Sequence, residues 1–105
     1  GSPTAVGGIT ERNADAAFKP YVGMLETCYY PHLSQHRNLS GRMMLRFTVG
    51  PQGELMSQKI SSSSIEPEVP EMIACVEQIL PNVKFDPLGD QKTAIVQYPV
   101  LFSPG

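Results

Sequence analysis

Residues 41–61 read GRMMLRFTVGPQGELMSQKIS, and this stretch decides the fold. Its first arm alternates between two sets of side chains, with Met43, Leu45, Phe47 and Val49 on one face and Arg42, Met44, Arg46 and Thr48 on the other. A period of two is typical of a strand with one buried face. The link Gly50–Gly53 contains two glycines and a proline, residue types that suit tight turns. The sequence therefore predicts a β-hairpin of fixed register, because a shift of one residue would turn four apolar side chains into water.

The composition indicates one ordinary globular domain. The chain has 105 residues, of which 41% are hydrophobic, enough for a single core. Eight basic and ten acidic residues give a net charge of −2, and no basic run favours nucleic-acid binding. The sequence has neither a signal peptide nor an apolar run long enough to predict a membrane span. The Gly1-Ser2 start looks like a cloning scar, so we expect residues 1–12 to be scar and flexible linker and residues 13–105 to be a domain of a longer protein.

Two helices are expected around the hairpin. Before it, Asn13 is a plausible N-cap, residues 14–19 a loose turn, and residues 20–30 the main helix, which Pro31 ends. After it, the serines at 61–64 suggest a turn or cap. A second helix then starts between Pro67 and Pro70 and runs to about Leu80, with apolar side chains at helical spacing.

The last strand is expected from Thr93 to Phe102, where apolar residues alternate along the chain. A right-handed helical crossover makes this strand parallel to the return arm of the hairpin, and therefore antiparallel to the first arm. The predicted fold is α+β, with two helices packed on one face of a three-stranded antiparallel sheet. The first arm lies in the centre, and Pro99 supports an edge position for the last strand.

The sequence contains two cysteines, Cys28 late in the first helix and Cys75 in the second. They could form a structural disulfide, remain two buried thiols, or act as a redox pair. Redox pairs usually have the close spacing C-x-x-C, which is absent here. The sequence leaves the first two alternatives open.

Other constellations for chemistry are weak. Cys28, His32 and His36 follow at intervals of four, but Pro31 should end the helix that would align them as metal ligands. The serine run lacks the G-x-S-x-G pattern of a nucleophile elbow. We therefore predict no catalytic residues, no metal site and no cofactor, and hence a protein that is not an enzyme.

An exposed edge of the sheet is the strongest candidate site. An edge strand presents unpaired backbone N–H and C=O groups that a partner's strand can pair with. The predicted edge consists of Thr93, Ala94, Ile95, Val96, Gln97 and Tyr98, which are uncharged and rich in β-branched side chains. The alternative is that the N-terminal tail covers this edge, or that it simply stays exposed.

Several short motifs occur together in a characteristic order. They are Cys28-Tyr29, Leu39-Ser40-Gly41 leading into the hairpin, Cys75, Phe85-Asp86-Pro87 and the closing Tyr98–Phe102. From Phe18 to Pro104 the chain resembles the TonB C-terminal domain family, and within it the AgmX/PglI-type domains of gliding-motility proteins.

This resemblance implies a periplasmic, non-catalytic module at the end of a protein anchored in the inner membrane. Such domains grip a segment of an outer-membrane or periplasmic partner by strand addition to the last strand, here Thr93–Tyr98, and transmit force from an inner-membrane motor. The oxidising periplasm suits a Cys28–Cys75 disulfide. Pro99 departs from the pattern and should confine pairing to the residues before it. A competing hypothesis is that two copies pair edge to edge as a homodimer that assembles an envelope complex.

Overall fold

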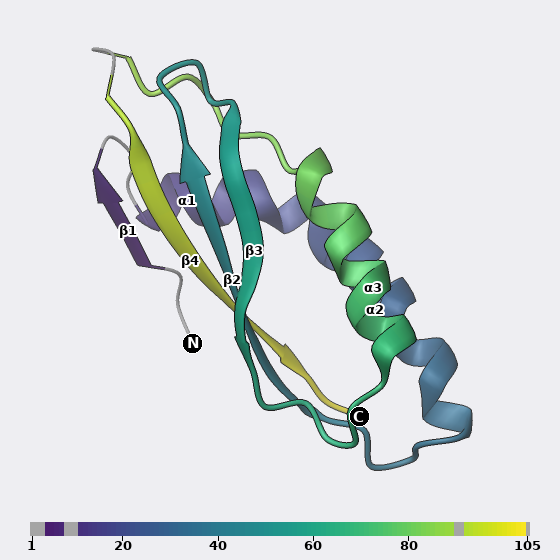
Figure 1. Cartoon of the computed structure of the whole chain (residues 1–105). Coiled ribbons are helices and arrows are strands. Elements are labelled where there is room, and N and C mark those ends of the chain that lie inside the picture. The colour runs from purple at the N-terminus through teal and green to yellow at the C-terminus, as the bar shows by residue number, and fades with distance from the viewer. Residues whose placement is uncertain (1–3, 8–10, 90–91, 105) are drawn as a thin grey trace.

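The computed structural model describes residues 4–7, 11–89 and 92–104. It contains four strands and three α-helices, joined in part by 3-10 turns (Figure 1). In chain order the elements are β1 (Thr4–Gly7), α1 (Glu11–Phe18), η1 (Lys19–Tyr21), α2 (Val22–Tyr29), η2 (Tyr30–Ser34), β2 (Gly41–Val49), β3 (Leu55–Ser63), α3 (Pro70–Ile79), η3 (Leu80–Asn82) and β4 (Ala94–Phe102).

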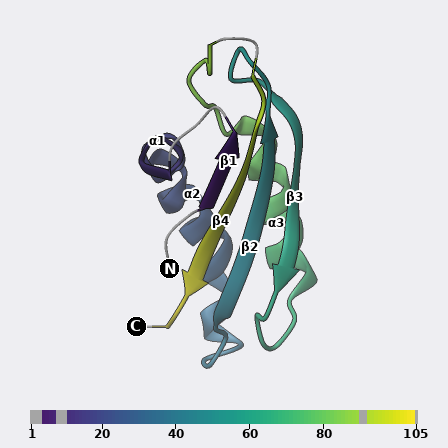
Figure 2. The same ribbon diagram turned by 90° about the vertical axis from the view of Figure 1, so that its left-hand side faces the viewer.

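The strands form one antiparallel sheet in the order β1-β4-β2-β3. The helices lie together on one face of this sheet and leave the other face open (Figures 1 and 2). The predicted neighbours β3, β2 and β4 are confirmed, but the sheet has four strands rather than three. The expected edge position of the last strand was wrong over Ala94–Gln97, where β4 has a neighbour on both sides. The prediction was wrong because residues 4–7, which have the composition of a linker, pair as β1 with the outer edge of β4.

The β2–β3 hairpin follows the alternation in the sequence. Met43, Leu45, Phe47 and Val49 are fully buried. The turn requires glycine at position 53, where φ is +84° and an added Cβ would lie 2.1 Å from the carbonyl oxygen of Phe85. This close approach fixes the hairpin against the loop that leads to β4.

The core lies between the sheet and the helices. Phe47 in β2 stands between two other rings, with centroids 5.9 Å from Phe18 and 5.6 Å from Phe85. Aliphatic side chains from the helices complete the cluster, among them Leu25, Met72, Val76 and Leu80. Burial of these apolar groups is the main force that holds the helices on the sheet.

The first helical segment is longer than the sequence predicts. Residues 14–18 belong to α1 instead of a loose turn, and Asn13 lies inside that helix rather than at its N-cap. Pro20 would interrupt a continuous α-helix, because it lacks an N–H group. Pro20 lies instead in the first turn of the 3-10 helix η1. The α-helix α1 precedes this turn and the α-helix α2 follows it.

The serine run is also different from the prediction. Ser61–Ser63 continue β3 instead of forming a turn or cap. Two serine hydroxyls in this run bond to the backbone of β2: Ser61 Oγ donates to the carbonyl of Met44 over 3.1 Å, and Ser64 Oγ accepts from the N–H of Arg42 over 3.0 Å. These bonds compensate for the small amount of apolar surface that serine brings to a strand.

A disulfide joins Cys28 in α2 to Cys75 in α3, with the two Cα atoms 5.6 Å apart. The two helices lie side by side (Figure 1). The disulfide therefore ties the two halves of the helical layer across 47 residues of sequence. Within the described residues, no helix is long and apolar enough to cross a membrane.

Candidate protein-binding edge

The outer edge of β4 is the site that the sequence predicts for a partner. On its inner side, β4 pairs with β2 from Ala94 to Phe102. On its outer side, it pairs with β1 over Ala94–Gln97 only. The outer edge therefore has an occupied part and a second part, 98–102, that no described strand covers (Figure 1).

The six residues predicted for docking divide between these parts. Thr93 precedes β4, the next four residues lie opposite β1, and Tyr98 is the first residue beyond it. The arrangement in this structure is the alternative that the sequence left open, in which the N-terminal tail covers the edge. A partner that pairs with Ala94–Gln97 would have to take the place of β1.

β1 is a thin cover. It has four residues, Thr4–Gly7, and the side chain of Val6 is 71% exposed. Only Ala5 packs against the core, and it is half-buried. Because a backbone hydrogen bond contributes only about 0.5–1.5 kcal/mol net, a strand with so little apolar burial is held weakly.

Gly7 controls how closely β1 approaches β4. Its φ is +109°, and an added Cβ would lie 2.3 Å from the carbonyl oxygen of Thr93 and 2.9 Å from the Cα of Ala94. Both neighbours are backbone atoms, which cannot move aside as a flexible side chain would. The end of β1 can therefore lie against β4 only when this position is glycine.

The underside of β4 is packed against α1 at the point where β1 stops pairing. The ring of Tyr98 lies 4.2 Å from that of Phe18, and its hydroxyl donates a hydrogen bond to Oδ1 of Asp15 over 2.5 Å. Burial, followed by this hydrogen bond and the negative charge of Asp15, raises the pKa of Tyr98 to about 12. An ordinary tyrosine begins to ionise near pH 10, so the surroundings of Tyr98 extend its neutral range to higher pH.

The uncovered part of the edge is a poorer template for pairing. Pro99 has no N–H to donate. Beyond it, Leu101 is 69% exposed on the open face of the sheet. A partner strand that continued past Tyr98 would find no N–H donor at Pro99. At Leu101 it would gain apolar contact.

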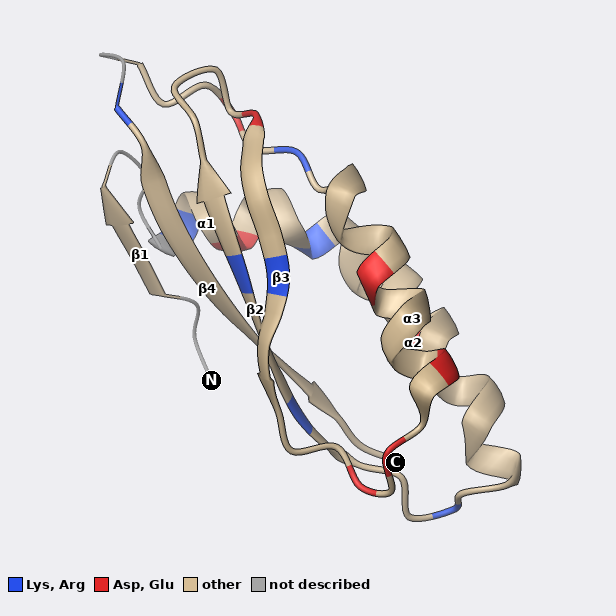
Figure 3. Cartoon of the chain, in the orientation of Figure 1, with Lys and Arg blue, Asp and Glu red and all other residues tan. Residues whose placement is uncertain are grey.

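The open face of the sheet carries positive charge. Arg46 in β2 and Lys59 in β3 are direct cross-strand partners (Figure 3). The same cross-strand row continues through Gln97 to Thr4 and contains no carboxylate. Like charges directly opposite each other repel, so the pair lowers the stability of the sheet.

The outer edge of β3, Leu55–Ser63, pairs with no other strand in the described part of the chain. Three of its features discourage pairing with another molecule: it carries Lys59, it is rich in serine, and its register shifts at two points. Charged side chains and bulges are common protections of free edges. Met56 is an exception, since its side chain is 61% exposed.

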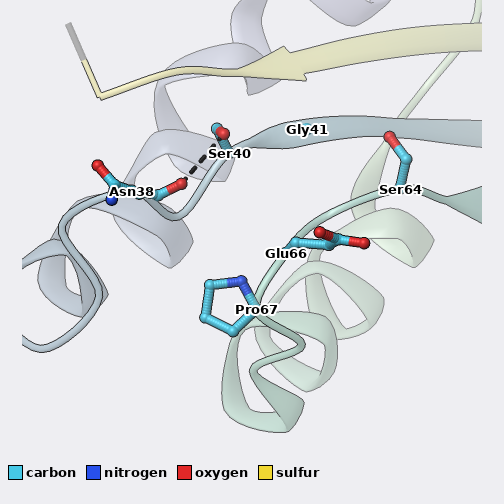
Figure 4. A pocket seen from close by; sticks show the side chains of 6 residues that line it. All are labelled: Asn38, Ser40, Gly41, Ser64, Glu66 and Pro67. Atoms are coloured by element: carbon cyan, nitrogen blue, oxygen red, sulfur yellow. Dashed lines mark hydrogen bonds between the residues drawn. The ribbon is translucent and has the colours of Figure 1, made fainter.

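A hollow lies where the segment before β2 meets the segment that follows β3 (Figure 4). Its lining consists of Asn38, Ser40, Gly41, Ser64, Glu66 and Pro67. Two backbone hydrogen bonds, of 3.2 and 3.0 Å, join Ser40 to Glu66. Four of the six lining residues have polar side chains, and none is a large apolar or aromatic residue of the kind that lines a typical ligand pocket. The described residues hold no cluster of His, Cys, Asp or Glu that could bind a metal.

The sequence left open that the N-terminal tail covers the edge, but neither a strand at residues 4–7 nor a role for Asp15 was predicted. Thr4 and Val6 are β-branched residues around a small alanine, which is a weak signal for a short strand. No local pattern connects Asp15 with Tyr98, which lies 83 residues further along the chain.

Comparison with known proteins agrees with this architecture. The model of the family described as "Gram-negative bacterial TonB protein C-terminal" matches residues 26–104. No match was found among curated protein sequences.

Two solved structures share the fold. Residues 179–285 of the Helicobacter pylori TonB C-terminal domain, determined in solution, align with a TM-score of 0.58 and 15% identity over 91% of this chain and 84% of that one. A shorter fragment of the same protein, residues 194–285, aligns with a TM-score of 0.54 and 19% identity over 84% of this chain and 94% of that one. At these identities the comparison shows a common fold.

Proposed function

Since the chain belongs to the TonB C-terminal domain family, we propose that it is a periplasmic, non-catalytic module that binds an outer-membrane or envelope partner by β-strand addition. The partner's segment pairs with the outer edge of β4, along Thr93–Tyr98. The domain then transmits force or energy from an inner-membrane motor to that partner, in gliding motility. Its parent protein is anchored in the inner membrane.

One observation carries the proposal: the outer edge of β4 accepts a second strand in this chain. β1 pairs there in a regular antiparallel register over four residues. The backbone groups on the outer edge of β4 are therefore oriented for main-chain hydrogen bonds, which supply much of the affinity in strand addition.

β4 is anchored firmly enough in the domain to bear a force applied through a bound partner. β4 is paired with β2 along its whole length, and its core-facing side chains Ala94, Val96 and Phe102 are buried. The Cys28–Cys75 disulfide holds the helical layer together, in keeping with an oxidising compartment. Force applied to the edge would thus be distributed over the sheet.

Site-specific crosslinking tests this function. A photoreactive benzoylphenylalanine replaces Gln97, which is half-buried on the open face of β4, and in a matched control it replaces the exposed Met56 of β3. Each purified protein is irradiated with outer-membrane extract, and crosslinked peptides are identified by mass spectrometry. We expect one envelope protein to crosslink through a short segment at position 97 and not at position 56. Equal crosslinking at both positions would refute docking at β4.

A homodimer is the second candidate, because the outer edge of β3 pairs with no other strand in the described part of the chain, and the exposed Met56 lies on it. Two copies could pair along Leu55–Ser63 and form a continuous sheet. Light scattering over a wide range of protein concentrations distinguishes the two functions: a mass that stays that of one chain, 11.5 kDa, excludes self-assembly. In the crosslinking experiment, a dimer would instead give crosslinks between copies at position 56.

A further inference from the structure

We infer that β1 is an internal occupant of the partner's site, and that its register describes the segment a partner must present: an antiparallel strand with a small residue opposite Val96 and a glycine opposite Ala94. This inference rests on the function proposed above. It adds which residues the partner's segment should carry, and it adds that this segment must displace β1 from β4.

The register of β1 supplies the pattern. Ala5 lies opposite Val96, and Val6 lies opposite Ile95. Val96 is fully buried on the core side of the sheet, so Ala5 also points toward the helices, whereas Val6 points to the open face. The two faces of an incoming strand therefore meet different surroundings.

The position of Ala5 accepts only a small side chain. Ala5 packs against the core at the margin of the sheet, and α1 lies next to β1 on this face (Figure 2). α1 is held there by Phe18 and by the Asp15–Tyr98 hydrogen bond. A larger side chain at this position would have to displace α1. By contrast, the side chain opposite Ile95 is free to vary, because Val6 is 71% exposed.

The position of Gly7 accepts no side chain at all. The 2.3 Å approach that a Cβ would make to the carbonyl oxygen of Thr93 applies to any strand that follows the same path. A partner's segment that carries glycine there can reach the start of β4, and one that carries another residue must end before it.

β1 lowers the apparent affinity for a partner. A site that is free in only a fraction of molecules binds with an affinity reduced by that fraction. If the open form amounts to about 10% or less, as is common for minor states, release of β1 strengthens binding about tenfold or more. The effective concentration of a strand on the same chain is in the millimolar range for a short link, so a weak strand can still compete.

Two full-length variants separate the open and closed forms. Gly7→Val places a Cβ against the backbone of Thr93 and leaves β4 unchanged, so β1 should come away. Gly89→Ala is the matched control, because Gly89 also has a positive φ, +72°, but an added Cβ would meet nothing within 4 Å. In the opposite direction, Val6→Cys/Ile95→Cys ties β1 to β4 by a disulfide, since antiparallel partners have Cα atoms about 4.5–5.5 Å apart, within the range that disulfides span.

The probe is a synthetic peptide with the sequence of residues 1–8, GSPTAVGG, titrated into each isotopically labelled protein and followed by NMR. We expect it to bind the Gly7→Val protein at least about tenfold more tightly than the wild type or Gly89→Ala, with shifts at the amides of Ala94–Gln97. The locked protein should not bind it. Circular dichroism establishes that every variant is folded, and peptide mapping establishes which cysteines are paired.

Two altered peptides test the pattern itself. GSPTLVGG, with leucine in the place of alanine, should lose binding to the Gly7→Val protein, whereas GSPTAKGG should keep it. Equal affinity of the wild-type and Gly7→Val proteins for GSPTAVGG would overturn the inference, and so would equal binding of the leucine peptide.

The failure of this inference can be told apart from failure of the proposed function. The locked protein carrying benzoylphenylalanine at position 97 is irradiated with outer-membrane extract, as above. Loss of the envelope crosslink supports both ideas. If the peptide results hold but the locked and wild-type proteins give the same crosslink, β1 still competes for β4 strands, and it is the docking function that is overturned.

Discussion

The hydroxyl of Tyr98 in β4 donates a hydrogen bond to Oδ1 of Asp15 in α1, 2.5 Å away. This bond, together with the packing of Phe18 on the Tyr98 ring, holds α1 beneath the edge of the sheet where β1 and β4 pair. The same surroundings raise the pKa of Tyr98 to about 12. The packing beneath the candidate site can therefore be followed through the ionisation of Tyr98.

The stability of the protein should fall with rising pH between about 10 and 12, in part because of Tyr98. An unperturbed tyrosine has a pKa near 10. In this window the unfolded chain has lost the Tyr98 proton and the folded chain still holds it, so unfolding is increasingly favoured. Below about pH 10 both states hold the proton, and this contribution to stability is fully present.

Tyr98→Phe provides the comparison, because phenylalanine keeps the ring but cannot ionise. We expect the free energy of unfolding, measured with urea at several pH values from about 9 to 12, to decline less steeply in this variant than in the wild type. Tyr29, whose pKa is also raised by burial, is present in both proteins and does not affect the difference. Equal slopes would mean that Tyr98 ionises normally in the folded protein.

Removal of the disulfide should lower stability substantially. The bond spans 47 residues, and the chain-entropy model assigns roughly 4 kcal/mol to a loop of this size. Domains of this kind have total stabilities of about 5–15 kcal/mol, so Cys28→Ala/Cys75→Ala should lose a large part of it. The measurement is the free energy of unfolding in urea under oxidising conditions.

Reduced wild-type protein is the control for the double variant. Reduction removes the same constraint without changing the volume of the side chains, so both proteins should be destabilised by a similar amount. A loss of less than about 1 kcal/mol would show that the denatured chain keeps α2 and α3 together without the bond, because residual structure in the unfolded state reduces the effect.

The hairpin was predictable because its information is local. Met43, Leu45, Phe47 and Val49 alternate without interruption, and all four are buried. The glycines at 50 and 53 mark the turn between the arms. Where period and turn residues agree, register follows from the sequence alone.

β1 was not predictable in the same way. Its pairing joins Thr4–Gly7 to Ala94–Gln97, segments about ninety residues apart, and only Ala5 meets the core. A strand held by backbone hydrogen bonds leaves almost no hydrophobic pattern to detect. α1 was missed for a different reason: Pro20 marks a real interruption, but a 3-10 turn absorbs it, and propensity cannot tell such a bend from an end.

The charge pair on the open face gives the last prediction. Arg46 and Lys59 are direct partners in β2 and β3, and their repulsion opposes the pairing of the hairpin arms. Lys59→Glu converts this contact into an attractive one, so we expect the free energy of unfolding to increase. Cross-strand pairs of this kind contribute about 0.2–1 kcal/mol. Thermal and urea denaturation at low salt would measure the gain.

Salt and position distinguish this local effect from a general effect of net charge. Both side chains are accessible to solvent to some degree, so the gain should shrink at about 1 M salt, where the Debye length falls to about 3 Å. Lys84→Glu is the matched control: it makes the same change in charge at an exposed loop position outside the sheet. If Lys84→Glu stabilises the protein as much as Lys59→Glu, the cross-strand repulsion does not explain the gain. If Lys59→Gln gives about half the effect of Lys59→Glu, relief of repulsion and new attraction contribute equally to the gain.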